Sequence, residues 1–475
     1  MGLCLKQESI VPMPQIKRDP VSFEMSFPVV VVGGGGTGLS AAIAASDGGA
    51  DVLVIERDAT PLGSTAMSTG LIPAAGTPEQ AVAGIEDSPE RFVADIMAKT
   101  KGRTDPAFAR MLAEESAETI AWLRDIHGVP LSLADGWLYP GHSAKRMYGT
   151  PNRAGGELMA ALESAADRAG VTVLANATCE ALHMHEDRVV GIHVVRPDGE
   201  RYDIGCGALI LACSGFGGNA DLVRRLIPEM ADATFHGHSG NKGDALLWGE
   251  QIGAGIADVS AYQGHAGLAV GHGVPILWPL IMEGGFQVNS LGERFSNEAA
   301  GYSEQAAKVN AQPGHIAFSI FDEKRHQLMM AFDDYHDALR AGAVIEAASV
   351  EELAAKTGLP FETLAATLAG VEQMVAGTRA DPFGRDFTGK APLAAPYRAA
   401  KVTGALFHTQ GGLIVDDEAH VVKAAGGAFP NLFAGGGAAR GVSGPGADGY
   451  LAGNGLLAAT TLGKIAGRAA AAIAA

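Results

Sequence analysis

The chain has 475 residues, of which 47% are hydrophobic and 19% are charged. This length exceeds one ordinary hydrophobic core, so we expect a fully folded chain of two or three domains. With 35 basic and 53 acidic residues, the net charge is −18. Such a charge repels phosphate backbones and anionic lipid, so we expect no nucleic-acid partner and no membrane-surface partner.

Four cysteines, at positions 4, 179, 206 and 213, show no CxxC or CxxCH spacing. That pattern argues against a zinc site, c-type haem and a disulfide framework, so we predict no metal and a reducing compartment. No apolar run reaches the roughly 18 to 20 residues that a membrane span needs. Residues 1–27 lack an apolar signal core and are interpreted as an N-terminal leader, and the protein is predicted to be cytoplasmic.

Residues 29–32, four valines bounded by glycine, predict a strand that is buried on both faces of a parallel sheet. Gly33, Gly35 and Gly38 follow with GxGxxG spacing, and the alanine-rich residues 39–45 predict a helix. These glycines allow a tight turn, a close approach to a pyrophosphate and helix–sheet contact, while the helix N-terminus attracts the phosphates.

A second strand, residues 51–55, ends in Glu56, which lies 18 residues after Gly38. A carboxylate there can accept hydrogen bonds from both hydroxyls of an adenosine ribose. A glycine turn alone is weak evidence in a chain with 64 glycines. Strand, turn, helix, second strand and acid together predict a dinucleotide site.

After Glu56, residues 57–77 form a loop of small residues suited to lie against a flat ligand. Hydrophobic spacing predicts two helices within 89–127 and another at 155–169, and strands at 171–174, 189–195 and 208–213. The last strand runs into a second glycine cluster beginning at Ser214.

The composition of the sequence changes near residue 258, and the segment that follows holds many of the aromatic and histidine residues. It includes a predicted helical stretch at 350–374 and ends in a linker-like segment at 381–396. We predict an α/β protein with a Rossmann-like dinucleotide-binding domain and an inserted α+β cap domain. The expected divisions are the leader 1–27, the first part of the nucleotide-binding domain 28–257, the cap 258–395 and the second part of the nucleotide-binding domain 396–475.

The motifs GGGGTG with Glu56, GSTAMSTG, LACSGFGGN, NKGDA, VNSLGERFSNE, FHTQGG and LFAGGG stand in this order. In this the chain resembles the FAD-dependent superfamily of soluble fumarate reductases, succinate dehydrogenase flavoproteins and 3-ketosteroid dehydrogenases, from about Pro28 onward. The resemblance implies FAD at the sheet, with substrate clamped between flavin and cap.

Two positions depart from the fumarate reductase pattern. Its proton-donor arginine, four residues after Asn-Glu, is replaced by Tyr302, and its carboxylate-clamping arginine before GGN is replaced by Tyr450. A buried dicarboxylate without such cations would cost several kcal/mol. We therefore expect a substrate other than fumarate.

Tyr302 instead matches the acid/base tyrosine of the ketosteroid dehydrogenases, and Gly444-Pro445-Gly446 matches their glycine-proline-glycine stretch in part. Whether Tyr450 or the Gly446 N–H holds the carbonyl stays open. His265 and His408 match substrate-contacting histidines of fumarate reductases. The resemblance thus implies four catalytic candidates: Tyr302, Tyr450, His408 and His265.

The residues predicted to bind FAD come from the motifs named above: Gly33, Gly35, Gly36, Thr37, Gly38, Glu56, Arg57, Ser64, Thr65, Ser68, Gly70, Ala212, Ser214, Gly215, Asp244, Gly436, Gly437 and Asn454. The loop after Glu56 holds no histidine, so we expect non-covalent FAD rather than a histidyl-flavin bond.

The predicted reaction is desaturation of a CH–CH bond next to a carbonyl, in a cyclic ketone or 3-ketosteroid, or the reverse enone reduction. A hydride passes to or from flavin N5 and a proton passes through Tyr302. The partners are this small carbonyl substrate and an unidentified electron acceptor: a quinone, oxygen or a redox protein. The alternatives are a fumarate-reductase-like reductase of an unsaturated acid, a nicotinamide dehydrogenase, and a flavin-binding redox or structural subunit without turnover.

Overall fold

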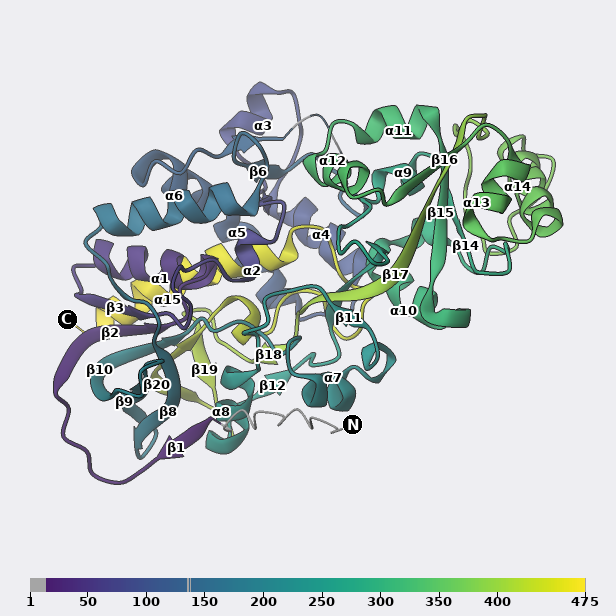
Figure 1. Ribbon diagram of the computed structural model, residues 1–475. Helices are drawn as coiled ribbons and strands as arrows, with labels where there is room; N and C mark the ends of the chain where they lie inside the picture. Colours follow the sequence, from purple (N-terminus) through teal and green to yellow (C-terminus); the bar gives the residue numbers. More distant parts are fainter. Residues whose placement is uncertain (1–13, 135, 137, 475) are drawn as a thin grey trace, which may run out of the picture.

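The computed structural model describes residues 14–134, 136 and 138–474 of the chain (Figure 1). Its larger sheet holds β2 (Met25–Val32), β3 (Val52–Ile55), β7 (Thr172–Leu174) and β10 (Arg201–Leu211). In this sheet β10, β2, β3 and β7 run parallel in that order. Val29, Val30 and Val31 are fully buried, which explains the continuous apolar run. The predicted α/β, Rossmann-like fold is confirmed.

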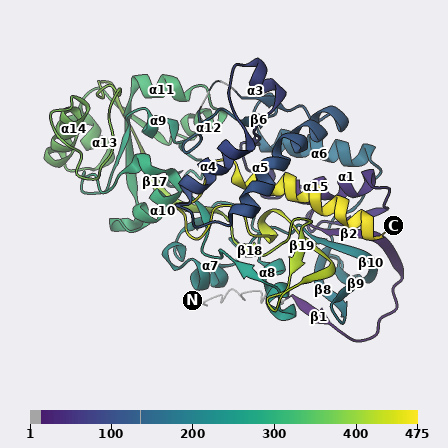
Figure 2. The same cartoon turned by 180° about the vertical axis from the view of Figure 1, so that it is seen from behind.

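Helix α1 (Gly36–Asp47) follows β2 and packs against α15 (Asn454–Ala474), at the far end of the chain (Figure 2). Added Cβ atoms at Gly463 and Gly467 would lie 2.6 and 2.1 Å from carbonyl oxygens of α1, so only glycine permits this approach. By length and composition α15 alone among the described helices passes as a candidate membrane span, but 67% of its apolar window is buried inside the fold.

The sheet continues beyond β10 through the antiparallel strands β9 (Arg188–Val195) and β8 (Thr178–His185), and β1 (Gln15–Lys17) then pairs in parallel with β8. Strand β8 was not predicted. The described part of the expected leader supplies β1 and the first residues of β2, while positions 1–13, including Cys4, lie outside the described residues. On the other edge of β10 lie β20 (Ala428–Ala434) and its partner β19 (His420–Val422).

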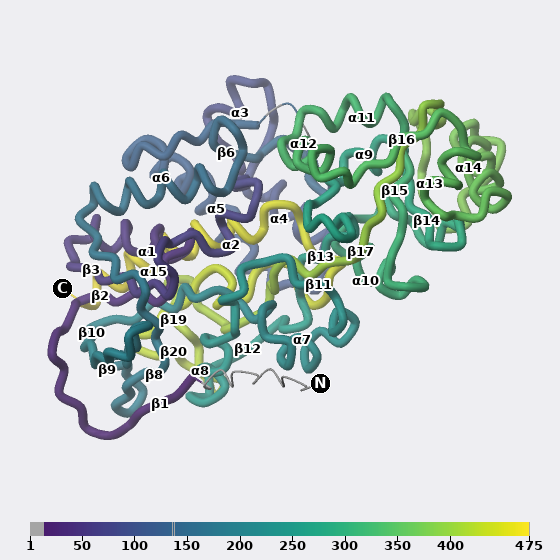
Figure 3. Tube along the Cα trace, viewed as in Figure 1, coloured from purple at the N-terminus to yellow at the C-terminus, as the bar shows by residue number. Residues whose placement is uncertain are grey.

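The cap is built on β17 (Tyr397–Thr409), which pairs with three antiparallel strands and one parallel strand. The antiparallel partners are β13 (Tyr262–Ala269), β15 (Ala317–Asp322) and β16 (Val344–Ala347). Strand β14 (Phe286–Val288) pairs with the far edge of β15, and β11 (Thr234–Phe235) pairs with β17 in parallel. Figure 3 shows β17 running from the cap back toward the larger sheet. This strand therefore carries cap structure past the boundary expected at residue 395.

Helices cover both parts. On the FAD side they are α2 (Gly63–Ala66), α3 (Pro78–Val82), α4 (Pro89–Lys99), α5 (Pro106–Ala121), α6 (Gly155–Arg168), α7 (Ala220–Leu226) and α8 (Asp244–Ile252). In the cap they are α9 (Pro279–Met282), α10 (Tyr302–Asn310), α11 (Glu323–Met329), α12 (Asp333–Arg340), α13 (Val350–Thr357) and α14 (Phe361–Val375). The remaining short strands are β4 (Ile72–Pro73), β5 (Ser132–Leu133), β6 (Met147–Gly149), β12 (Ile256–Ala257) and β18 (Gly412–Leu413).

Two cap segments differ from expectation. The helical stretch 350–374 is split into α13 and α14, because Gly358 adopts φ +75° and Pro360 then precedes α14. The linker-like exit is coil, yet its Arg385 is buried and donates to the carbonyls of Gly285 and Ile281. That segment is therefore an anchored part of the cap.

Candidate active site

A cavity of about 1390 Å³ lies between the larger sheet and the cap. It is lined by the glycine turn after β2, by the loop around α2, by cap residues and by the glycine-rich C-terminal segment. Of the predicted FAD residues, fourteen line it: Gly33, Gly35, Gly36, Thr37, Glu56, Arg57, Ser64, Thr65, Ser68, Ala212, Ser214, Asp244, Gly436 and Gly437. All four predicted catalytic residues line it as well.

The glycine turn has the geometry of a pyrophosphate site. Gly33 adopts φ +104°, and a Cβ at Gly38 would lie 1.8 Å from the Gly33 carbonyl oxygen, so Gly38 brings helix and strand together instead of lining the cavity. A Cβ at Gly35, the N-cap of α1, would meet no atom within 4 Å. The space above the helix N-terminus is thus open to an anion.

Glu56 lies at the end of β3 and is 8% exposed. Its Oε2 accepts from the Gly34 N–H at 2.7 Å, and its Oε1 accepts from the Asp58 N–H at 2.8 Å. Two backbone donors hold the carboxylate at the edge of the cavity. This placement fits the predicted contact with ribose hydroxyls.

Sequence reasoning missed the wall beyond Glu56, which includes Ala177, Thr178, Cys179 and Trp248. Ala177 directly precedes β8, and Thr178 and Cys179 begin it; this strand was not predicted, so these three residues carried no recognised signal. The indole Nε1 of Trp248 and the Nε of Arg57 are buried without a partner among the described residues. Such unpaired donors beside an open space fit a polar ring system at the adenosine end.

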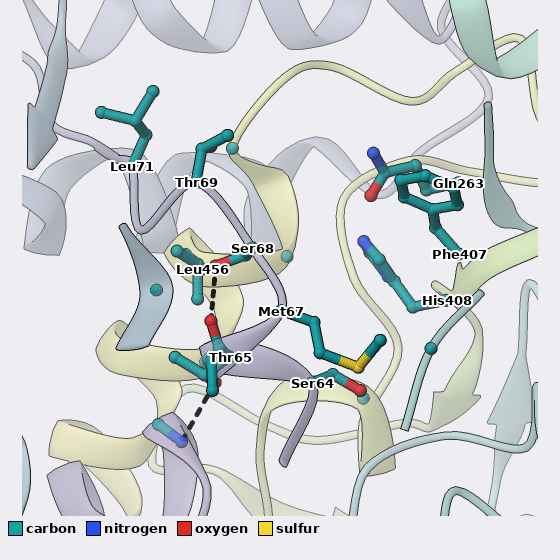
Figure 4. Close-up of a pocket in the computed structure, with 18 of the residues that line it drawn as sticks. Ser64, Thr65, Met67, Ser68, Thr69, Leu71, Gln263, Phe407, His408 and Leu456 are labelled. Atoms are coloured by element: carbon teal, nitrogen blue, oxygen red, sulfur yellow. Dashed lines mark hydrogen bonds between the residues drawn. The ribbon is translucent and has the colours of Figure 1, made fainter. Parts of the chain in front are cut away.

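The α2 loop lies against the other end of the glycine turn (Figure 4). Thr65 Oγ1 accepts from the Gly36 N–H at 3.2 Å, and Ser68 Oγ donates to the Thr65 carbonyl at 2.7 Å. Ser64 Oγ accepts from Asn241 Nδ2 at 2.8 Å. Gly70, with φ +64°, packs against Ala154 outside the cavity lining.

The C-terminal glycines close the site from the opposite side. A Cβ at Gly436 would lie 2.1 Å from Thr37 Oγ1, so this glycine allows the C-terminal segment to touch the start of α1. Gly215 and Asn454 stand behind the wall, and Asn454 is fully buried with its Oδ1 unpaired. The cavity is therefore completed by segments from both halves of the chain.

Tyr302 and Tyr450 meet across the boundary between cap and FAD domain. Their ring centroids are 6.0 Å apart at an interplanar angle of 66°. Burial raises the pKa of Tyr302 well above its ordinary value, and the neighbouring Tyr450, to which it is hydrogen-bonded, raises that pKa further. Burial also raises the pKa of Tyr450, against the opposing effects of its hydrogen bonds with Tyr302 and the Gly453 backbone. Both residues are neutral phenols at pH 7.

His265 and His408 lie on the paired strands β13 and β17, next to the tyrosines. The His265 ring lies 5.3 Å from Tyr302 and stacks on Phe407 at 5.1 Å, while the His408 ring lies 5.8 Å from Tyr450. Burial lowers the pKa of His265 to about 3 and that of His408 to about 4. Both imidazoles are therefore neutral at physiological pH.

Their hydrogen bonds define the tautomers. His265 Nδ1 accepts from the Gly267 N–H at 3.1 Å. His408 Nδ1 lies 3.0 Å from Gln410 Nε2 and 3.4 Å from the Thr409 carbonyl, and the shorter contact is to an amide donor. In each neutral ring Nε2 then carries the proton and can donate to an oxygen in the cavity.

Aromatic residues surround the tyrosine pair. Trp278 lies 6.3 Å from Tyr302 between ring centroids, and Phe407 and Tyr139 also line the cavity. Figure 4 shows Gln263, Phe407 and His408 across the pocket from Thr69 and Leu71. Sequence reasoning missed Trp278, Phe407, Tyr139 and Gln263; a signal was available for Phe407, which directly precedes His408 in the FHTQGG motif, and for Gln263, which lies two residues before His265.

Three side chains elsewhere are close enough together to hold a metal ion: His183, His193 and Asp203. In the structure both imidazoles hydrogen-bond to Asp203 Oδ1, at 2.7 and 2.8 Å. The Nδ1 of His183 is buried and has no partner among the residues that the structure describes. A metal-ligating histidine usually donates its second N–H, and the described part of the chain offers this ring no acceptor for it. The cluster fits a hydrogen-bonded network better than a metal centre.

Comparisons with known proteins agree with this geometry. The FAD binding domain family model matches residues 28–456. The fumarate reductase (cytochrome) of Shewanella frigidimarina is 30% identical over 446 residues, covering 93% of this chain and 76% of that protein. The NADH:fumarate oxidoreductase of Klebsiella pneumoniae is also 30% identical over 94% of this chain, which spans about half (48%) of that longer protein.

Solved structures show the same fold. A flavocytochrome c3 fumarate reductase in its open conformation superposes with a TM-score of 0.81 at 28% identity, covering 95% of this chain and 79% of that one. The 3-ketosteroid-Δ4-(5α)-dehydrogenase of Rhodococcus jostii RHA1 superposes with a TM-score of 0.78 at 26% identity, covering 97% and 99%. The chain therefore belongs to the FAD binding domain family and is an FAD-dependent oxidoreductase of the fumarate reductase and ketosteroid dehydrogenase type.

Proposed function

We propose that this protein adds or removes two hydrogens across a C–C bond next to a carbonyl, in a neutral or mono-anionic substrate such as a cyclic ketone or 3-ketosteroid. The observation that carries the proposal is the Tyr302–Tyr450 pair, which stands where the fumarate reductase pattern has two arginines. Among the described residues that line the cavity, the lysines and arginines are Arg57, Arg153 and Lys390. A dicarboxylate beside the tyrosines would lack a counter-charge.

FAD, when bound, supplies or accepts the hydride. The residues of the chain must then move a proton and hold the carbonyl. Tyr302 suits proton transfer because it comes from the cap, on the side of the cavity opposite the glycine turn. Its raised pKa keeps the phenol protonated at neutral pH, so it is a proton donor as it stands. This protonation state favours enone reduction, and desaturation would need the phenolate.

Tyr450 is the better candidate for the carbonyl. It lines the cavity at 7% exposure, whereas Gly446 lies outside the lining. Burial raises the pKa of Tyr450, so its phenol keeps its proton at neutral pH and can donate it to a substrate oxygen, while its hydrogen bonds with Tyr302 and the Gly453 backbone partly oppose that increase. The neutral His265 and His408 can donate from Nε2 to the same substrate.

A second candidate is a fumarate-reductase-like reductase of an unsaturated carboxylic acid. The sequence similarity to fumarate reductases and the positions of His265 and His408 favour it. Other relatives carry the names urocanate reductase, NADH:acrylate oxidoreductase and vinyl phenol reductase, so the family reduces several kinds of C=C bond. A flavin-binding subunit without turnover remains the candidate from another class.

One screen separates these candidates. Purified protein, with its flavin reduced by a viologen dye, is offered 4-androstene-3,17-dione, 2-cyclohexenone, acrylate and fumarate, and reoxidation is followed spectroscopically. We expect reoxidation by an enone and little by fumarate. Rapid fumarate reduction would overturn the proposal in favour of the second candidate. Inertness toward all four probes, and toward saturated ketones with the oxidised flavin, would favour the subunit without turnover.

A Tyr302→Phe variant tests the proton donor, because it keeps the ring and removes the hydroxyl. We expect retained FAD, an unchanged far-UV spectrum and turnover of the active enone reduced by roughly 10²-fold or more. Tyr139→Phe is the matched control, since it removes a phenol from the same cavity. Near-normal turnover in Tyr302→Phe would assign the proton transfer elsewhere, with His408 the next residue to test.

A further inference from the structure

Helix α4 is firmly tied to the FAD side of the molecule. The guanidinium of Arg146, whose side chain has no exposed surface, binds Asp87 just before the helix at 2.8 Å and Asp95 within it at 2.6 Å. Ser88 caps the helix N-terminus by accepting from the Arg91 N–H. A charge-assisted network of this kind leaves α4 little freedom to move.

The C-terminal residue of α4 reaches across to the cap. Lys99 Nζ lies 3.0 Å from Glu304 Oε1 and 3.5 Å from the carbonyl oxygen of Ala300. The two side chains are only 17% and 15% exposed. Ala300 and Glu304 stand two residues before and two residues after Tyr302 in the chain. Lys99 therefore binds both the backbone turn before Tyr302 and the first turn of the helix that begins at Tyr302, the proposed proton donor.

The segment around Tyr450 is also bound by residues that follow α4. Asp448, two residues before Tyr450, binds Lys101 at 2.8 Å and also binds Arg103. His142 Nε2 donates to the Ala452 carbonyl, two residues after Tyr450, at 2.9 Å. Lys101 and Arg103, which follow α4, thus bind the Tyr450 segment together with His142, while Lys99 binds the Tyr302 segment of the cap.

We propose that Lys99 is a positioning residue, which keeps Tyr302 of the cap in register with Tyr450 through its contacts with Glu304 and the Ala300 carbonyl. The proposal rests on the function proposed for Tyr302. It makes the Lys99–Glu304 pair a latch between cap and FAD domain, set beside the reacting atoms.

The burial of this pair predicts an asymmetry between its two partners. Glu304 Oε2 already lacks a partner among the described residues. Removing Lys99 would leave a nearly buried carboxylate without its cation, whereas neutralising Glu304 leaves Lys99 its carbonyl contact and some exposure. Loss of the cation should therefore lower the free energy of unfolding far more than loss of the anion does. Removing both charges should lower the free energy of unfolding little more than removing the anion alone.

The test compares Lys99→Met, Glu304→Gln, the double variant and Lys99→Arg as FAD-bound full-length proteins. The control is Arg110→Met, which removes a cation from a half-exposed pair on α5. Hydrogen–deuterium exchange of residues 299–306 is measured first. We expect faster exchange there in Lys99→Met, by about tenfold or more, and similarly fast exchange in the double variant, which also lacks the Lys99 contacts.

Turnover of 4-androstene-3,17-dione, or of whichever enone probe the wild-type protein reduces, is the second readout. We expect kcat to fall by about tenfold or more in Lys99→Met with KM changed less than about threefold, because a misplaced acid affects the chemical step. Lys99→Arg should recover most of it, and the double variant should not, because it has no cation to hold the Tyr302 turn. Loss of kcat in the double variant, which carries no unpaired buried carboxylate, separates positioning from a general loss of stability.

The proposal is overturned if Lys99→Met matches Arg110→Met in exchange, or if the double variant regains control-like exchange and turnover, because the unpaired Glu304 carboxylate alone would then explain the effect of Lys99→Met. A wild-type protein that reduces no enone would contradict the proposed function, while the exchange measurement would still decide whether Lys99 holds the Tyr302 turn.

Discussion

His265 and His408 show how burial sets the chemistry of single side chains. An exposed histidine has a pKa near 6.5, but burial lowers the pKa values here to about 3 and about 4. Burial similarly lowers the pKa of His142 to about 4, and its Nδ1 and Nε2 are occupied by Arg146 and the Ala452 carbonyl. These three rings are neutral hydrogen-bonding groups, so none of them should give activity a pH dependence between pH 6 and 8.

The same shifts predict how stability depends on pH. Below pH 6.5 the unfolded chain binds protons at these histidines and the folded chain does not, so the stabilisation present above pH 6.5 is lost as pH falls toward 4. A His265→Phe variant, which keeps an aromatic ring against Phe407, should weaken this dependence by up to about 1.4 kcal/mol per pH unit. Urea unfolding at pH 7.5, 6 and 5, at saturating FAD, measures it. Identical pH dependence in both proteins would show that His265 is protonated in the folded state.

Among the contacts between elements, the packing of α1 against α15 shapes the cofactor site. Gly463 and Gly467 of α15 lie against Thr37, Ser40, Ala41 and Ala44 of α1 and let the two backbones approach closely. This approach brings Gly436 against Thr37, at the N-terminus of α1 where the pyrophosphate is expected. The glycines of the C-terminal helix therefore shape the cofactor site without lining it.

A Gly467→Ala variant tests that contact. The new Cβ would lie 2.1 Å from the Ala41 carbonyl oxygen, which is backbone, so the helices would have to separate. We expect a loss of about 1 to 3 kcal/mol in the free energy of unfolding and weaker FAD retention. Gly156→Ala in α6 is the control: its Cβ meets nothing within 4 Å, so it should be neutral or stabilise by about 0.4 to 1 kcal/mol. Equal stability of the two variants would contradict the argument.

At the scale of the whole molecule, the cofactor site joins the two ends of the chain. Gly33 and Glu56 stand near the beginning and Gly436 and Gly437 near the end, and all four line one cavity. The cap adds the tyrosine and histidine cluster from the middle of the chain. FAD should therefore stabilise the folded state as a whole.

Removal and re-addition of FAD test this. FAD at about 100 times its dissociation constant should raise the free energy of unfolding by about 2.7 kcal/mol, seen as a higher melting temperature. Replacing Glu56 with Ala should weaken FAD binding by about 1 to 3 kcal/mol, the scale of charge-assisted hydrogen bonds left unmade. Ser164→Ala, on the exposed side of α6, is the control. Unchanged FAD affinity in Glu56→Ala would remove that residue from the ribose site.

Much of the fold was predictable because its signals are local. The valine run of β2, the glycine turn, α1, β3 and Glu56 follow one another within 28 residues, and each has a pattern set by strand or helix geometry. Strand β8 was missed because its buried and exposed residues do not alternate regularly, and the turn before it is marked by Asn176, which adopts φ +51°, and not by a glycine or proline. The break between α13 and α14 depended on Gly358 and Pro360, two ordinary helix-ending residues inside a long apolar pattern.

The sequence by itself determined the FAD-binding fold, the glycine turn and the identity of the tyrosines that stand where the fumarate reductase pattern has arginines. Only the tertiary structure decided that Tyr302 and Tyr450 touch, that the nearby histidines are neutral, and that Lys99 binds Glu304 across the domain boundary. These contacts join residues about 150 to 200 positions apart. Local periodicity carries no information about such distances, whereas burial and pKa depend on them directly.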